Sequence, residues 1–262
     1  DLLSLRLRKP LWHEGNAWGE FLALQWDLAL HGYGVPHGDK SPIMTIPGFK
    51  SNDFFHASIN YFLDRINYDV YLSGINDLNG HTDPIREAKR LIPIVKGIHQ
   101  DKGKRFHLVG HSLGGSVARY IAMAAPESVA SITALASPRY EDFEESIDPF
   151  VLGIAKASIP TLRKPEELEE IRRQLSQPLP KGIKSTYIHT RDDGVVSYEA
   201  TMDDDPQTEN VETAGTHSGL IVNGKVYRIL GRILSEAVEV ERQREARHAK
   251  ILVFPTSPRS AA

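Results

Sequence analysis

Short apolar runs alternate with longer amphipathic stretches along most of the chain. Apolar runs that end at glycine, proline or other turn residues are typical of buried strands. We predict strands at residues 43–46, 69–73, 105–109, 131–136, 185–190 and 210–214. Apolar residues at helical spacing predict helices over about 17–30, 51–66, 82–100 and 115–125, and a last helix from 226 onward. This alternation predicts an α/β fold with a mostly parallel sheet of about six strands, covered by helices on both faces.

The length of 262 residues suits a single domain over 1–262. The segment between the strands at 131–136 and 185–190 is longer than one crossover needs. We expect residues 140–182 to form a helical cap inserted above the sheet. The alternative is a pair of crossover helices on the back of the sheet. The two predicted helices are marked by Phe143, Ile147, Phe150, Val151 and Ile154, and by the run from Pro165 to Leu175.

All three tryptophans of the chain lie near its beginning, at Trp12, Trp18 and Trp26. A helix from about Ala17 to Leu30 would carry several apolar side chains at helical spacing. The simpler interpretation is a helix packed on the sheet, and the functional one is an aromatic anchor for a lipid or substrate surface.

Charge and composition exclude several classes of function. The chain has 31 basic and 34 acidic residues and a net charge of −3, which gives no reason to expect a nucleic-acid partner. Cysteine is absent, which excludes disulfides, thiolate catalysis and zinc–cysteine sites, and we expect neither a metal nor a cofactor. No apolar run is long enough for an integral membrane segment. The start of the chain does not resemble a signal sequence, so we expect a cytoplasmic protein, with secretion after removal of a leader left open.

The clearest motif is Gly-His-Ser-Leu-Gly at residues 110–114. It follows a predicted buried strand and precedes a helix that ends at Pro126, the context in which a G-x-S-x-G motif exposes its serine on a sharp turn. Gly110 and Gly114 have to be small because the strand and helix backbones pass close together there. We therefore predict Ser112 as a nucleophile. The alternative is an ordinary glycine-rich turn with a surface serine.

Two backbone N–H groups are candidates for stabilising negative charge next to Ser112. The N–H of Leu113 opens the helix and points toward the serine. The second is expected from the loop after strand 43–46, where Gly48 allows close approach and the N–H of Phe49 is available. We expect the Phe49 ring to line an apolar pocket.

A serine nucleophile needs a base, and in this architecture the acid and then the histidine follow it along the chain. Three histidines come after Ser112. His189 lies within a predicted strand and His248 in a polar helix. His217 lies in a loop directly after the last strand, so we predict it as the base.

The acid is expected after strand 185–190, where Asp192 and Asp193 stand side by side. Gly194 allows the chain to turn behind Asp193, and the two following valines would anchor the loop, so Asp193 is the better candidate. Asp142 is a more remote one. The acidic residues 203–205 are interpreted as a solvated loop with weak cation affinity at most.

Together these motifs resemble those of bacterial α/β-hydrolases of the small esterase or lipase type. The resemblance rests on residues 47–49, 110–115, 190–196 and 210–220, and extends over about residues 41–235. It implies a triad of Ser112, Asp193 and His217, with oxyanion donors at Phe49 and Leu113. The H-G-G-G form of the oxyanion loop is missing, which argues against the branch similar to hormone-sensitive lipase.

We therefore expect a cofactor-independent serine hydrolase that cleaves carboxylic esters, from small molecules or lipids, through an acyl-enzyme on Ser112. An acyltransferase with the same triad is the alternative. A binding protein that lacks catalysis but keeps the fold is a third possibility. A cap would favour medium or long acyl chains.

Overall fold

The six predicted strands form one parallel sheet in a computed structural model, which describes residues 8–78, 83–139 and 143–253. The strand order is β2-β1-β3-β4-β5-β6, and every neighbouring pair is parallel. The bounds are β1 Pro42–Ile46, β2 Asp69–Leu72, β3 Phe106–His111, β4 Val129–Leu135, β5 Lys184–His189 and β6 Thr208–Glu212. The prediction of a parallel six-stranded sheet is confirmed, and the strand that leads to Ser112 lies in its interior.

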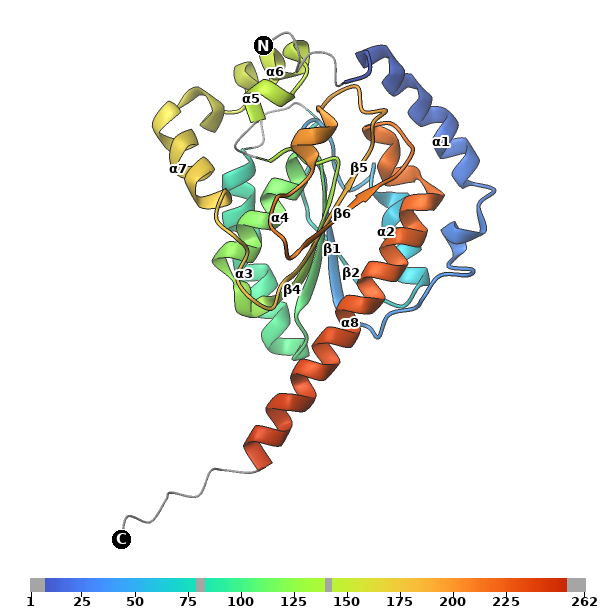
Figure 1. Cartoon of the computed structure of the whole chain (residues 1–262), viewed down its shortest axis with the longest axis vertical. Coiled ribbons are helices and arrows are strands. Elements are labelled where there is room, and N and C mark those ends of the chain that lie inside the picture. The colour runs from blue at the N-terminus through green and yellow to red at the C-terminus, as the bar shows by residue number, and fades with distance from the viewer. Residues whose placement is uncertain (1–7, 79–82, 140–142, 254–262) are drawn as a thin grey trace.

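Helices cover both faces of the sheet, as predicted (Figure 1). Helices α3 and α4 pack on one face and α2 and α8 on the other, where the rings of Phe62 and Tyr227 stack with centroids 4.5 Å apart. The α-helices are α1 Ala17–Leu24, α2 Ala57–Arg65, α3 Pro84–Lys102, α4 Leu113–Ala124, α5 Phe143–Ser146, α6 Pro149–Ser158, α7 Pro165–Leu175 and α8 Gly224–Val253. The described 3-10 helices are η2 Leu11–Asn16, η3 Leu28–His31, η4 Pro126–Ser128, η5 Thr161–Arg163, η6 Tyr198–Thr201 and η7 Ser218–Val222.

Two predicted helices are shorter than expected, and in both an aspartate near the boundary binds backbone groups outside the helix. The N-terminal helix α1 ends at Leu24, and Asp27 then caps the short 3-10 helix η3 through the N–H of Ala29 at 2.9 Å. Helix α2 begins only at Ala57, since Asp53 accepts hydrogen bonds from Ser73 and Gly74 after β2.

The N-terminal helix α1 packs against the core through only one of its sides. Leu24 is fully buried and Phe21 packs against the same apolar core. The side chains of Trp12, Trp18 and Trp26 point into solvent instead. The indole rings are therefore not part of the core.

The segment after β4 lies beyond the carboxyl ends of the strands, where α5, α6 and α7 gather at one end of the molecule (Figure 1). Its first helix is split in two, because Asp148 and Pro149 begin α6 anew and Asp148 accepts the N–H of Phe150. The expected stripe is rotated: Phe150 is exposed, while Ala155 is buried. The apolar side of α7 is buried as expected, through Leu168, Ile171 and Leu175.

Candidate active site

Ser112 sits on a strained turn between β3 and α4. Its backbone has φ 51° and ψ −126°, a conformation that a residue with a side chain rarely adopts. A Cβ on Gly110 would lie 2.3 Å from the carbonyl oxygen of Gly114, and one on Gly114 would lie 2.0 Å from that of Ile46. The prediction that these glycines allow strand and helix to pass closely is confirmed. The turn presents Ser112 at the carboxyl end of the sheet, half-buried.

The loop after β1 packs directly on the serine. A Cβ on Gly48 would lie 2.9 Å from the Cβ of Ser112 and 3.5 Å from the backbone nitrogen of Leu113. Only glycine therefore allows this loop to come so close. The structure brings together Phe49 and Leu113, the two residues predicted as oxyanion donors, because both line one small cavity with Ser112. Their role as donors stays a prediction.

Asp193 and His217 form a buried hydrogen-bonded pair. The distance from His217 Nδ1 to Asp193 Oδ2 is 2.7 Å. The other oxygen, Oδ1, accepts the N–H groups of Val195 and Val196, both at 2.7 Å, which fixes the carboxylate against rotation. The neighbouring Asp192 instead forms a solvent-exposed ion pair with Lys9 at 3.7 Å. Of the two adjacent acids, Asp193 is therefore the one that faces the histidine.

The loop that carries His217 is attached to the turn that carries Ser112. His111 Nε2 lies 2.9 Å from the backbone oxygen of His217, and the two imidazole rings are 5.0 Å apart. Burial holds the pKa of His111 well below its usual range, so the ring is neutral and its Nε2–H donates this bond. His111, which directly precedes Ser112, thus attaches the loop of the predicted base to the turn of the predicted nucleophile.

The electrostatic surroundings of His217 favour its protonated form. Burial by itself lowers the pKa of a histidine, but the carboxylate of Asp193 and the charge of Glu14 offset this, and the pKa lies above its usual value. The imidazole is therefore a stronger base than in water, and its protonated form is stabilised by a fixed partner.

Glu14 and Glu20 are two residues near this site that the sequence analysis missed. Both come from the N-terminal segment and accept hydrogen bonds from backbone N–H groups of the loop around His217. Their partners are roughly 200 residues away in the chain, with separations of 196, 203 and 204. No local pattern could have indicated them.

The other candidate residues do not join the site. His189 lies in β5 with its Nε2 3.9 Å from Glu212, while Asp142 and the side chain of His248 fall outside the described residues. The acidic residues at 203–205 are partly neutralised, because Asp203 pairs with Arg119 at 2.7 Å and Asp204 with Arg139. Among the residues that the structure describes, no cluster of ligands suits a metal ion.

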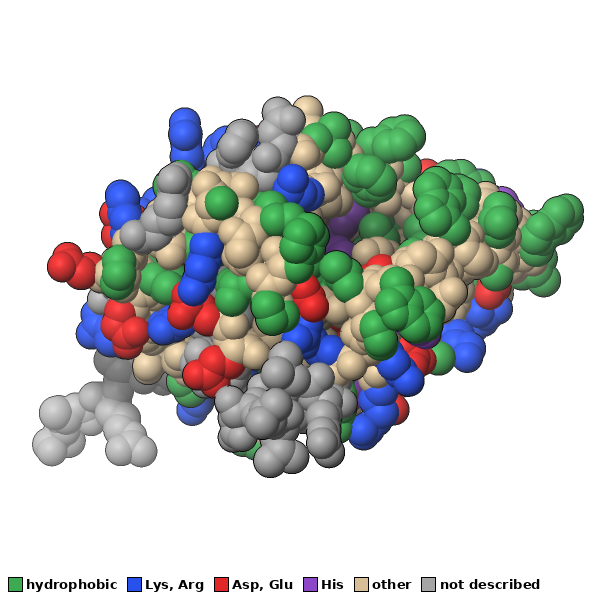
Figure 2. All heavy atoms as spheres, turned by 90° about the horizontal axis from the view of Figure 1, so that it is seen from above, with side chains coloured by type: hydrophobic (Ala, Val, Ile, Leu, Met, Phe, Trp, Pro, Cys, Tyr) green, Lys and Arg blue, Asp and Glu red, His purple; other side chains and the backbone are tan. Residues whose placement is uncertain are grey.

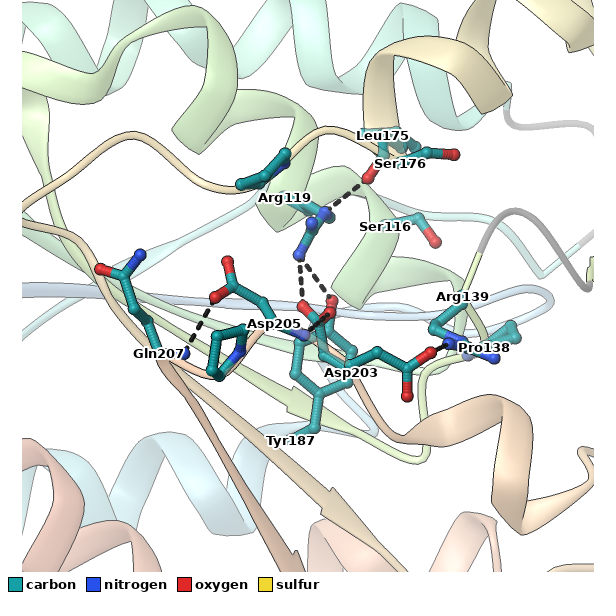
Figure 3. Close-up of a pocket in the computed structure, with 13 residues that line it drawn as sticks. Ser116, Arg119, Pro138, Arg139, Leu175, Ser176, Tyr187, Asp203, Asp205 and Gln207 are labelled. Carbon is teal, nitrogen blue, oxygen red and sulfur yellow. Dashed lines mark hydrogen bonds and ion pairs between the residues drawn. The ribbon is translucent and has the colours of Figure 1, made fainter.

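A cavity of about 350 Å³ lies beside this acidic loop (Figure 3), and Ser112 is not among its lining residues. Arg119 crosses it and donates to the carbonyl oxygens of Leu175 and Gln177 as well as to Asp203. These contacts tie α7, α4 and the loop before β6 together, which is a structural role.

The cavity at Ser112 is small and apolar. Its volume is about 30 Å³, far below the several hundred Å³ of ordinary ligand pockets. Helix α6 and the residues next to it supply one wall, and the loop after Asp193 supplies another. The lining residues include Phe49, Ile147, Val151, Ala155, Ile159, Val195 and Val196.

Comparison with known proteins agrees with this fold. A family model described as alpha/beta hydrolase fold matches residues 102–179. A triacylglycerol lipase of Pseudarthrobacter phenanthrenivorans is 26% identical over 117 residues, which are 40% of this chain and 37% of the lipase. One of Pseudomonas fragi is 31% identical over 91 residues, which are 34% of this chain and 30% of that lipase. The match thus spans about a third of the length of these curated relatives.

Solved structures resemble the chain over most of its length. The mature lipase BlEst2 of Bacillus licheniformis superposes with a TM-score of 0.58 at 15% identity, over 77% of this chain and 95% of that one. Mouse alpha/beta hydrolase domain-containing protein 10 gives 0.54 at 16% identity, over 77% and 91%. The chain therefore has the α/β-hydrolase fold. In the part of the chain that the structure describes, no helix has the length and apolar character needed to span a membrane.

Proposed function

We propose that this chain is a serine hydrolase that cleaves carboxylic esters, with Ser112 as nucleophile, His217 as base and Asp193 as the acid that orients it. The observation that carries the proposal is the buried 2.7 Å pair of His217 and Asp193, which His111 attaches to the strained turn of Ser112. An oriented base next to a serine on such a turn is the arrangement that nucleophilic catalysis requires.

The reaction follows from these groups. Ser112 Oγ attacks the ester carbonyl while Nε2 of His217 takes the hydroxyl proton, and the carbonyl oxygen becomes an oxyanion facing the N–H groups of Leu113 and Phe49. The C–O bond to the alcohol then breaks, and His217 gives the proton to the departing oxygen. Water repeats the sequence on the acyl-enzyme, so that the carboxylic acid leaves and Ser112 is restored.

The substrate class is an ester with an apolar acyl group. The cavity next to Ser112 is lined almost entirely by aliphatic and aromatic side chains, and the matched curated relatives are named triacylglycerol lipases. An aliphatic acyl chain gains free energy by leaving water for such a lining. We infer a preference for medium or long acyl chains over acetyl groups.

Residues 140–182 act as a cap that has to move before a substrate enters. A cavity of about 30 Å³ holds little more than one water molecule. The wall formed by α6 is the part most easily displaced, because Ala155 is its fully buried residue while Phe150 faces solvent. Opening would enlarge the apolar cavity, and closing would exclude water from the charged transition state.

Hydrolysis of p-nitrophenyl esters with acyl chains from two to sixteen carbons tests the proposal. We expect activity that rises beyond the acetyl ester and is lost by about 10⁴-fold in Ser112→Ala, with the melting temperature unchanged. Activity that survives in Ser112→Ala would contradict the assignment of the nucleophile. A series that peaks at the acetyl ester would contradict the substrate class alone.

A further inference from the structure

One carboxylate, that of Glu14 in η2, joins the two loops that carry Asp193 and His217. Its Oε1 accepts the N–H of Gly194 at 2.9 Å and the N–H of His217 at 3.2 Å. Its Oε2 accepts the N–H of Ser218 at 2.9 Å. The Glu14 side chain therefore binds Gly194, which directly follows Asp193, and also the consecutive residues His217 and Ser218.

The backbone of His217 is fixed from both sides as a result. Glu14 accepts its N–H, and His111 donates to its carbonyl oxygen at 2.9 Å. Asp193 then has only to set the rotation of the ring through Nδ1. A displacement of about 1 Å in such a group can reduce the rate about 100-fold, so this attachment matters for catalysis.

Glu14 also acts on the charge of the imidazole. The groups that face His217 are the carboxylates of Asp193 and Glu14 and the neutral ring of His111. Both carboxylates raise the pKa of His217 against the effect of burial. The imidazolium that forms during proton transfer is thus stabilised by two negative charges, although only one of them contacts the ring.

We propose that Glu14 is a positioning residue, which aligns the loops of Asp193 and His217 and adds a second negative charge beside the base. This inference rests on the proposed function, because it assigns a role within the same site. The residue comes from a segment whose sequence pattern indicates only the role of its apolar side chains.

The substitution Glu14→Gln tests the charge with almost no change of shape. The amide oxygen can keep the bonds that Oε1 accepts, but the charge and the second acceptor are lost. We expect kcat to fall about tenfold or more with little change in KM, and the acid limb of the pH profile of kcat/KM to move to lower pH. Glu14→Asp keeps the charge but cannot reach both loops, so kcat should fall while the acid limb stays near its original position.

Glu20→Gln is the matched control, because Glu20 lies in the same segment and accepts the N–H of Thr216 at 2.8 Å without contacting His217 or Gly194. We expect it to leave the acid limb in place. The proposal is overturned if Glu14→Gln leaves both kcat and the acid limb unchanged. It is also overturned if both glutamine variants lower the melting temperature equally and neither moves the acid limb, since Glu14 would then be only an anchor.

A measurement without turnover separates this proposal from the proposed function. In the Ser112→Ala protein, the ring of His217 can be titrated by NMR, with His217→Ala to assign its signal. Glu14→Gln should lower the pKa of the ring even if no ester is hydrolysed. An unchanged pKa would refute the electrostatic part of the proposal, whatever the enzyme does with esters.

A different observation concerns the outer side of the same N-terminal segment. Five apolar side chains there are mostly exposed to solvent, and we call them the tryptophan face. They are Trp12 at 77% exposure, Trp18 at 76%, Leu22 at 62%, Trp26 at 90% and Leu28 at 64%. Large groups of exposed apolar side chains mark sites of interaction with other proteins or with membranes.

The carboxylates of this segment all bind other parts of the chain. Residues 10–38 contain no lysine or arginine. Of their acidic residues, Glu14 and Glu20 bind the loop of His217, and Asp27 pairs with Arg228 at 2.6 Å. The tryptophan face therefore carries no charge from its own segment, and it offers no electrostatic complement to an anionic or cationic partner.

The segment that carries the tryptophan face adjoins the loop of His217, because Glu14 and Glu20 bind that loop. Figure 2 shows hydrophobic side chains gathered around a hollow in which histidine atoms are visible. We infer that this face rests on the surface of neutral or zwitterionic lipid, with the indoles at the level of the headgroups. The inference rests on the proposed function, since it brings the candidate site to a lipid ester.

Sedimentation with phosphatidylcholine vesicles tests this inference in the Ser112→Ala protein, so that the result does not depend on hydrolysis. We expect binding that salt and added phosphatidylglycerol do not strengthen. The triple substitution Trp12→Ser, Trp18→Ser and Trp26→Ser should weaken it on the order of 100-fold. Substitution of the exposed Ile94 and Val240 by serine, away from this segment, is the control and should leave it unchanged.

Three results would overturn the inference. The first is absence of vesicle binding. The second is binding that requires phosphatidylglycerol and disappears in salt, which would indicate basic side chains elsewhere. The third is a stable dimer in the absence of lipid that the triple substitution dissociates, because a second copy of the chain would then cover the tryptophan face.

Discussion

Replacing Asp193 by asparagine should abolish most of the activity through the tautomer of His217. The two N–H donors of Val195 and Val196 require an oxygen at the Oδ1 position, so the new amide nitrogen must face His217 Nδ1. Nδ1 then has to accept a hydrogen bond, and the ring proton moves to Nε2, the atom that should take the proton of Ser112. The expected loss in kcat is about 10⁴-fold, or about 5 kcal/mol of transition-state stabilisation.

The neighbouring acid provides the control for this prediction. Asp192 meets Lys9 at 3.7 Å, with both side chains more than 40% exposed, so Asp192→Asn should change activity by no more than about threefold. All three hydrogen bonds of Asp193 can re-form in the amide, so the melting temperature of Asp193→Asn should stay within a few degrees. Kinetics on a p-nitrophenyl ester and a thermal melt check both variants. Equal losses at the two positions would refute the assignment of the acid.

Four other predictions concern pH, the turn of Ser112 and the cap. The pKa of His217 lies above its usual value, and only the neutral ring accepts a proton. We therefore expect kcat/KM to fall with decreasing pH at a midpoint above the pKa of an ordinary histidine. A midpoint below that pKa would contradict the raised pKa of His217. His56 and His107 have a pKa of about 4 because burial disfavours their charged forms. The free energy of unfolding should therefore decrease as pH falls from about 6.5 toward 4, by about 2 kcal/mol for each histidine at pH 5. Urea unfolding at pH 7 and pH 5 would measure this decrease. Gly114→Ala should destabilise the fold by several kcal/mol, since its Cβ would lie 2.0 Å from a backbone oxygen, and an unchanged urea midpoint would contradict this. Val151→Ala should widen the cavity at Ser112 and shift the preferred acyl chain toward greater length, whereas an unchanged chain-length profile would place substrate elsewhere.

The sheet could be predicted because its four inner strands, β1, β3, β4 and β5, are short runs between turn residues that are buried on both faces, whereas the edge strands β2 and β6 are only partly buried. The turn of Ser112 could be predicted because the contact of Gly110 with Gly114 is local in sequence, although Gly114 itself packs against Ile46 of β1. Asp193 could be preferred over Asp192 because the glycine and valines that follow it form the loop that buries it. These features depend on neighbours within a few residues, which a sequence displays directly.

The features that could not be predicted depend on contacts between distant parts of the chain. Asp53 looks like a helix cap, but the end of β2 captures its carboxylate, and α2 begins at Ala57. Glu14 reaches Gly194 across 180 residues, and this contact turns the polar side of its segment inward. The tryptophans consequently face solvent, although the spacing of apolar residues suggested a helix that packs on the sheet. Local patterns cannot indicate which side of a short helix finds a polar partner.

The most direct test of the central claim is to map the site at which a fluorophosphonate probe labels the protein. Mass spectrometry of the digested protein should find one adduct, on the peptide that contains Ser112. Labelling should be absent in Ser112→Ala and much slower in His217→Ala, because the hydroxyl reacts only when a base takes its proton. An adduct on another residue, or labelling of Ser112 at the same rate without His217, would contradict the account.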